Sequence, residues 1–76
     1  MGISGRQVAA ARELLGISQD ELAQAVNIAS STLRRFENGQ HSPRPLTLHA
    51  IQTELERRSI EFLNTGGIGV FLQSKM

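Results

Sequence analysis

The first part of the chain carries apolar residues at the spacing of a helix. Four of them form a stripe on one side of this segment: Val8, Ala11, Leu14 and Leu15. Ser4 and Gln7 stand ahead of the stripe in the S-x-x-Q pattern of a capping box, in which each side chain satisfies a backbone N–H at the helix start. Gly16 follows the stripe, and glycine readily adopts the left-handed backbone that ends a helix. The pattern predicts a first helix between Ser4 and Gly16.

A second capping box, of the S-x-x-E type, marks the start of another short helix. It is formed by Ser18 and Glu21. The apolar stripe that follows consists of Leu22, Ala23 and Val26. Asn27 comes where a turn needs a positive φ, which asparagine tolerates better than most residues. We therefore expect the chain to turn at Asn27 and Ile28.

A third amphipathic segment follows this turn. Leu33 and Phe36 fall on its inner side, and Asn38 with Gly39 supplies a left-handed stop. The outer side is polar and basic, with Ser30, Ser31, Arg34 and Arg35. The run from Ser18 to Gly39 thus predicts a helix-turn-helix arrangement, which can present one helix to the major groove of DNA.

The pattern predicts one more helix and then changes character. After a polar loop from Gln40 to Arg44, Pro45 suits the first turn of a helix, where its missing N–H costs nothing. The apolar stripe of this helix consists of Leu48, Ile51 and Leu55, and it ends near Ser59.

Two apolar runs near the end of the chain predict a β-hairpin. They span Ile60–Leu63 and Ile68–Leu72 and flank the turn-forming segment 64–67. A hairpin is marginal alone, so its apolar residues need a surface to cover. Two interpretations are open: the hairpin closes the core of its own domain against the first and fourth helices, or it joins two copies of the chain.

Composition restricts the possible functions. The chain has 76 residues, which is one small domain, and no cysteine, which excludes disulfides and thiolate metal sites. His41 and His49 have no third ligand at useful spacing, so we expect no metal site. The net charge is only +1, but the segment from position 30 to position 50 contains three arginines, Arg34, Arg35 and Arg44, and only one acidic residue, Glu37. For nucleic-acid binding, a local basic surface matters more than the total charge of the chain.

The motif region resembles the Cro/repressor helix-turn-helix family, the lambda repressor-like or XRE-type proteins. The residues that match the family pattern are Gln19, Glu21, Leu22, Ala23, Thr32, Leu33, Glu37, Asn38 and Gly39. Asn27 stands where the family usually has glycine, and Ala29 where it usually has a serine or threonine cap; alanine cannot cap a helix. The resemblance implies a mainly α fold of about four helices over residues 1–59, with residues 60–76 as a hairpin extension of the same compact unit.

The resemblance also assigns roles to residues of this chain. Ser30, Ser31 and Arg35 would face base edges, with Thr32 and Arg34 beside them. A second group would hold the phosphate backbone: Gln19 at a helix start, and Asn38, Gln40 and Arg44 after the third helix. Glu37 would pair with Arg12 and join the motif to the first helix.

These roles favour a DNA-binding transcriptional regulator, most simply a repressor that occupies a two-fold operator as a dimer formed through the hairpin or the fourth helix. The alternative is a protein-interaction module, such as an antitoxin that binds a toxin through the hairpin and regulates its own operon. Neither interpretation requires an enzyme or a cofactor. The sequence has no secretory leader and no apolar run of about 20 residues that could span a membrane, so we expect a cytoplasmic protein.

Overall fold

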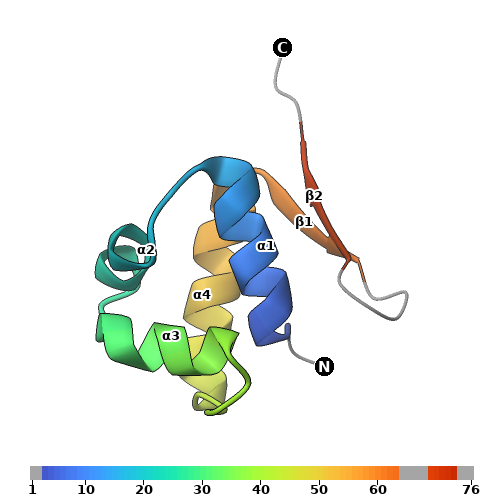
Figure 1. The fold of residues 1–76 in the computed structure, drawn as a ribbon. Helices are drawn as coiled ribbons and strands as arrows, with labels where there is room; N and C mark the ends of the chain where they lie inside the picture. The colour runs from blue at the N-terminus through green and yellow to red at the C-terminus, as the bar shows by residue number, and fades with distance from the viewer. Residues whose placement is uncertain (1–2, 64–68, 74–76) are drawn as a thin grey trace.

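The computed structural model describes residues 3–63 and 69–73 and has the predicted mainly α architecture (Figure 1). Its elements are α1 (Gly5–Leu15), α2 (Gln19–Ala25), α3 (Ser30–Glu37), α4 (Pro45–Arg57), β1 (Ile60–Leu63) and β2 (Gly69–Leu72). In Figure 1, α2 and α3 lie on one side of α1, and the hairpin lies on the other.

The helix ends lie at residues whose side chains or backbone conformations favour a helix start or stop. Both capping boxes form, with Ser4 at the start of α1 and Ser18 at the start of α2. Gly16 ends α1 in the left-handed conformation, at φ 71°. Pro45 is the first residue of α4, where no intrahelical N–H is required.

The core lies where the four helices and the first strand meet. Among the described residues, the largest fully buried side chains are those of Leu22, Leu33, Ile51, Leu55 and Val8. Burying a side chain of this size contributes about 1.5–3 kcal/mol each. One prediction about the core is wrong, because Leu14 is 48% exposed. Val8, Ala11 and Leu15 already fill the inner side of α1, and Leu14 falls beside that stripe on the helix surface.

The strands form an antiparallel pair as predicted. Ile60 lies opposite Leu72, and Phe62 lies opposite Val70. Ile60 is buried, while Phe62 and Val70 pack against the core from its edge. The predicted turn at 64–67 and the first residue of the predicted second strand, Ile68, lie outside the described residues. The hairpin therefore covers the core of its own domain, and β1 contacts α4 while β2 contacts α1.

A buried glutamine fastens the hairpin to α1. Gln7 is only 5% exposed, and its side-chain oxygen caps α1 by accepting from the Ser4 N–H. Its Nε2 donates to the carbonyl oxygens of Leu63, at 3.3 Å, and Gly69, at 3.0 Å. The side chain of Gln7 thus forms hydrogen bonds with the start of α1 and with both strands.

Candidate nucleic-acid interface

The two helices of the motif are held together by a tight turn between them. Asn27 adopts φ 60°. The N–H of Ile28 donates to the carbonyl of Ala23 at 2.9 Å, and that of Asn27 donates to Gln24 at 3.2 Å. The turn brings the buried side chains of α2 against Leu33 of α3. This packing fixes the direction of α3 relative to the rest of the molecule.

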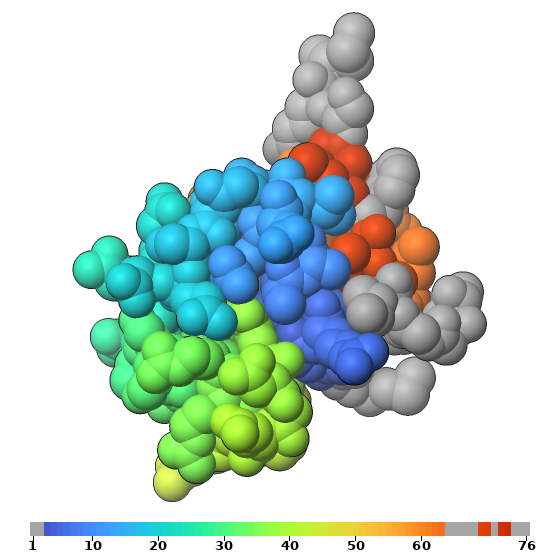
Figure 2. Space-filling model, viewed as in Figure 1, coloured from blue at the N-terminus to red at the C-terminus, as the bar shows by residue number. Residues whose placement is uncertain are grey.

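The opposite side of α3 is open to solvent. Leu33 and Phe36 face the core, while Arg34 and Arg35 are exposed. Within residues 3–63 and 69–73, the side chain of neither arginine has a hydrogen-bond or ion-pair partner. Ser31 is exposed as well, and Thr32 is half-buried. Figure 2 shows that α3 and the loop after it project at one end of the molecule, away from the hairpin.

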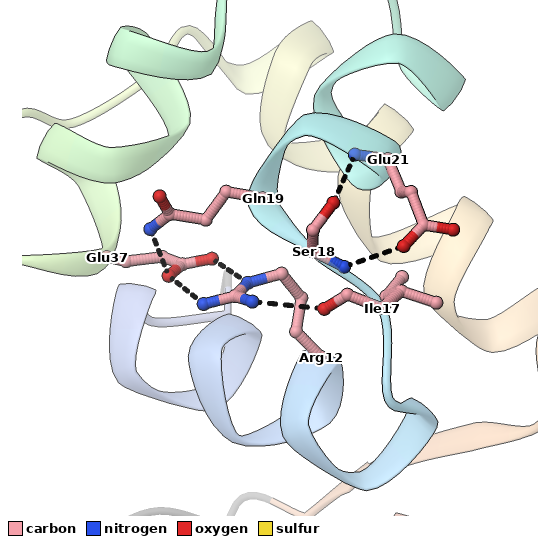
Figure 3. Close-up of polar contacts among 6 residues, drawn as sticks. All are labelled: Arg12, Ile17, Ser18, Gln19, Glu21 and Glu37. Carbon is pink, nitrogen blue, oxygen red and sulfur yellow. Dashed lines mark hydrogen bonds and ion pairs between the residues drawn. The ribbon is translucent and has the colours of Figure 1, made fainter.

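A polar cluster around Glu37 fixes the end of α3 to α1 (Figure 3). The Arg12 guanidinium forms a two-pronged pair with the Glu37 carboxylate, with Nε–Oε2 2.8 Å and Nη2–Oε1 2.9 Å. The Glu37 side chain is only 4% exposed. The hydrogen bond to Glu37 raises the pKa of Arg12, against an opposing effect of burial. Removing one member of such a pair typically costs about 3–5 kcal/mol, because the other charge stays buried without a partner.

Two further contacts complete this cluster. The Nη1 of Arg12 donates to the carbonyl of Ile17 at 3.1 Å, just before the Ser18 cap of α2. The Nε2 of Gln19 donates to Glu37 Oε1 at 2.9 Å. No pattern in the sequence indicates this second contact. The predicted phosphate ligand Gln19 therefore has one amide hydrogen engaged within the protein (Figure 3).

The start of α3 has a partner that the sequence did not reveal. Ala29 makes no side-chain capping bond, as expected for alanine. The hydroxyl of Ser30, the first residue of α3, instead donates to the carboxylate of Asp20 on α2. This contact places a negative charge beside the start of α3, where the helix dipole favours an anion. Ser30 is half-buried, in contrast to the open position expected for a base-reading residue.

The loop after α3 presents the remaining predicted residues. Asn38, Gln40 and Arg44 are all exposed. Gly39 takes φ 77°, and the Gln40 N–H donates to the carbonyl of Arg35 at 2.8 Å. This left-handed stop turns the chain away from the helix axis. The loop residues therefore follow directly on the exposed side of α3.

The close packing of α1 on the end of α3 depends on Gly5. A Cβ at this position would lie 2.0 Å from the Phe36 carbonyl oxygen and 2.9 Å from the Glu37 Cα. Only glycine allows this approach. The sequence does not indicate the requirement, because a glycine at the first position of a helix is equally compatible with an open surface.

The chain belongs to the Cro/repressor-type helix-turn-helix family. The family described as "Helix-turn-helix" matches residues 8–63, well over half of the chain. The chain is also similar to a protein of Methanothermobacter thermautotrophicus (strain Delta H) named "Uncharacterized HTH-type transcriptional regulator", with 38% identity over 50 residues, covering 66% of this chain and 72% of that protein. These comparisons support DNA binding in transcription regulation as the class of function, and members of this class are typically not enzymes.

Two kinds of feature are absent from the described residues. No helix in this part of the chain is long and apolar enough to cross a membrane. Within residues 3–63 and 69–73, no three histidine, aspartate or glutamate side chains gather where they could hold a metal ion.

Proposed function

We propose that the chain represses transcription by occupying a two-fold operator. The observation that carries this proposal is the state of α3. The side chains of its arginines are exposed and have no hydrogen-bond or ion-pair partner among the described residues, while the Glu37 carboxylate at its end is paired with Arg12 of α1. A rigid helix with unpaired cations on its outer side suits a major groove lined by phosphates and base edges. A protein bound there would block polymerase without catalysis.

Arg35 is the proposed principal reader of base sequence. Its planar guanidinium can donate two hydrogen bonds to O6 and N7 of guanine. Arg34, Ser31 and Thr32 flank it on α3, and Ser30 begins the helix. Hydroxyl groups can donate or accept, so they narrow the choice of base less than a guanidinium does.

The proposed phosphate contacts come from two places. Gln19 begins α2, where backbone N–H groups and the remaining amide hydrogen can point to a phosphate oxygen. Asn38, Gln40 and Arg44 form the second place, in the exposed loop. Such contacts set the position of the protein on DNA and carry little sequence information.

A two-fold operator requires two copies of the chain, which we propose to join through the hairpin or the end of α4. Leu63 and Leu72 of the hairpin are 38% and 37% exposed, and a two-stranded sheet leaves its outer edges unpaired. Sedimentation equilibrium, with the protein free and bound to DNA, tests this step. A monomer under both conditions would exclude it. A toxin partner would use the same exposed residues of the hairpin, and no contact of the described residues favours that alternative over a second copy of the chain.

The repressor proposal is tested by selecting bound sequences from a random DNA library and measuring binding of the selected site. Arg35→Ala should lose the preference among sequences. Arg44→Ala should weaken binding to all sequences alike and reduce the slope of log affinity against log salt by about 0.9. Arg57→Ala, which removes an equal charge from the exposed end of α4, is the matched control. Because the end of α4 is one of the proposed contacts between copies, sedimentation equilibrium first establishes that this variant assembles as the wild type does, and it should then change neither result. Retention of the sequence preference in Arg35→Ala would refute the assignment of the reader.

A further inference from the structure

The hydrogen bond between Ser30 of α3 and Asp20 of α2 determines which hydrogen-bonding groups the start of α3 presents to a base. The Ser30 hydroxyl donates its one proton to the Asp20 carboxylate. The oxygen of Ser30 then keeps only acceptor lone pairs, and an ionised carboxylate is an acceptor as well. Asp20 is exposed, and Ser30 is half-buried. The Asp20–Ser30 pair, as we name these two side chains, is therefore an acceptor-only group at the start of α3.

An acceptor-only group discriminates strongly in the major groove. Guanine offers only the acceptors N7 and O6 there, and thymine offers the acceptor O4 with a methyl group. Cytosine and adenine carry amino groups that can donate. Adenine also presents N7, an acceptor that would face the carboxylate unfavourably, whereas cytosine presents no acceptor of its own. The base that best fits the pair is cytosine.

The pair also complements the arginines on the same helix. The guanidinium groups of Arg34 and Arg35 only donate hydrogen bonds and so suit guanine, while the Asp20–Ser30 pair at the start of the helix only accepts them. We propose that Asp20, a residue of α2 and not of the recognition helix, selects cytosine at one position of each half-site together with Ser30. This inference rests on the proposed DNA binding and adds a specificity-determining residue to it.

The test is a selection from a random DNA library with the wild-type protein and Asp20→Asn. The substitution keeps the size of the side chain but adds an amide donor, so it removes the acceptor-only character. We expect the wild type to prefer cytosine at one half-site position by about tenfold or more, and Asp20→Asn to lose that preference while it keeps guanine at the position read by Arg35. Ser30→Ala should reduce the cytosine preference, because the carboxylate loses the hydroxyl that positions it.

The loss of a negative charge needs its own control. Glu13→Gln removes one charge with little change of shape from an exposed position of α1, outside the proposed DNA and dimer contacts. Both Asp20→Asn and Glu13→Gln should bind all DNA somewhat more tightly, but only Asp20→Asn should change the base preference. Circular dichroism melting of each variant establishes that it is folded.

The outcomes separate the two proposals. Unchanged base ratios in Asp20→Asn, with a wild type that selects a defined site, would overturn the role of Asp20 and leave the repressor proposal intact. A wild type that enriches no sequence would overturn both. A change in base preference in Glu13→Gln equal to that in Asp20→Asn would also overturn the inference, because the effect would then be one of charge alone.

Discussion

The capping boxes of α1 and α2 are built from the same hydrogen bonds. Ser4 Oγ accepts from the Gln7 N–H at 3.1 Å, and Ser18 Oγ accepts from the Glu21 N–H at 3.0 Å. In each box the side-chain oxygen of the third helical residue accepts from the serine N–H at 2.9 Å. The two helix starts are therefore stabilised locally in the same way.

The boxes differ in what the third residue does beyond the helix start. Glu21 is exposed, and in the described part of the chain its side chain forms a hydrogen bond only with the N–H of Ser18. Gln7 is buried, and its amide nitrogen donates to the carbonyls of Leu63 and Gly69 in the hairpin. A carboxylate could not make these last two contacts, because it has no proton to donate. An amide at this position lets a capping box also hold a distant part of the molecule.

The largest expected effect comes from Gln7→Glu. The new carboxylate could still cap α1, but it would be buried against two carbonyl oxygens with no donor between them. We expect the free energy of unfolding to fall by about 3 kcal/mol or more. Urea unfolding followed by circular dichroism measures this change. Hydrogen exchange should show the amides of β1 and β2 losing protection before those of α2 and α3.

A small loss in this experiment would be informative too. If Gln7→Glu lowered the stability by less than about 1 kcal/mol, comparable to a neutral hydrogen bond, the amide contacts to the hairpin would not hold it in place. The difference between the two boxes would then be one of burial only.

The features that could be predicted from the sequence are local ones. Helix starts, helix stops and the turn depend on residues that cap or bend the backbone within a few positions of themselves, so their residue types suffice for the prediction. These residues are Ser18 with Glu21, Gly16, Asn27 and Pro45. The apolar spacing also predicts most of the core correctly. It is wrong for Leu14, at the edge of the apolar stripe of α1, because the packing of neighbouring elements decides whether a residue at that position is exposed.

The contacts that join distant segments could not be predicted in this way. Gln7 reaches carbonyls 56 and 62 residues further along the chain, and a capping box gives no sign of them. The same holds for Gly5 against α3 and for Asp20 with Ser30. The pair of Arg12 with Glu37 was expected only from the family resemblance, because no spacing rule links residues on separate helices. The DNA roles of the exposed side chains stay predictions.

A smaller effect, equal in both boxes, is expected from removing the serines. Ser4→Ala and Ser18→Ala each delete the acceptor for one backbone N–H and should each cost about 1 kcal/mol. For a domain of this size that lowers the melting temperature by roughly 4–8 °C. Thermal unfolding of the two variants side by side measures it. A much greater loss in Ser4→Ala would indicate that Ser4 also positions Gln7 for the hairpin, and the local parts of the boxes would then not be equivalent.

The smallest effect is expected from Glu21→Gln, the reverse of the substitution at position 7. The amide oxygen can still accept from the Ser18 N–H, so the capping hydrogen bonds persist. What is lost is a negative charge in the first turn of α2, whose interaction with the helix dipole contributes about 0.3–1 kcal/mol at low ionic strength. The difference in stability from wild type should shrink further at about 1 M salt, where charges are screened beyond about 3 Å. Because Gln7→Glu and Glu21→Gln exchange the same two residue types at equivalent helix positions and both keep the capping hydrogen bonds, equal losses in the two variants would mean that the contacts of Gln7 with the hairpin contribute little to the stability.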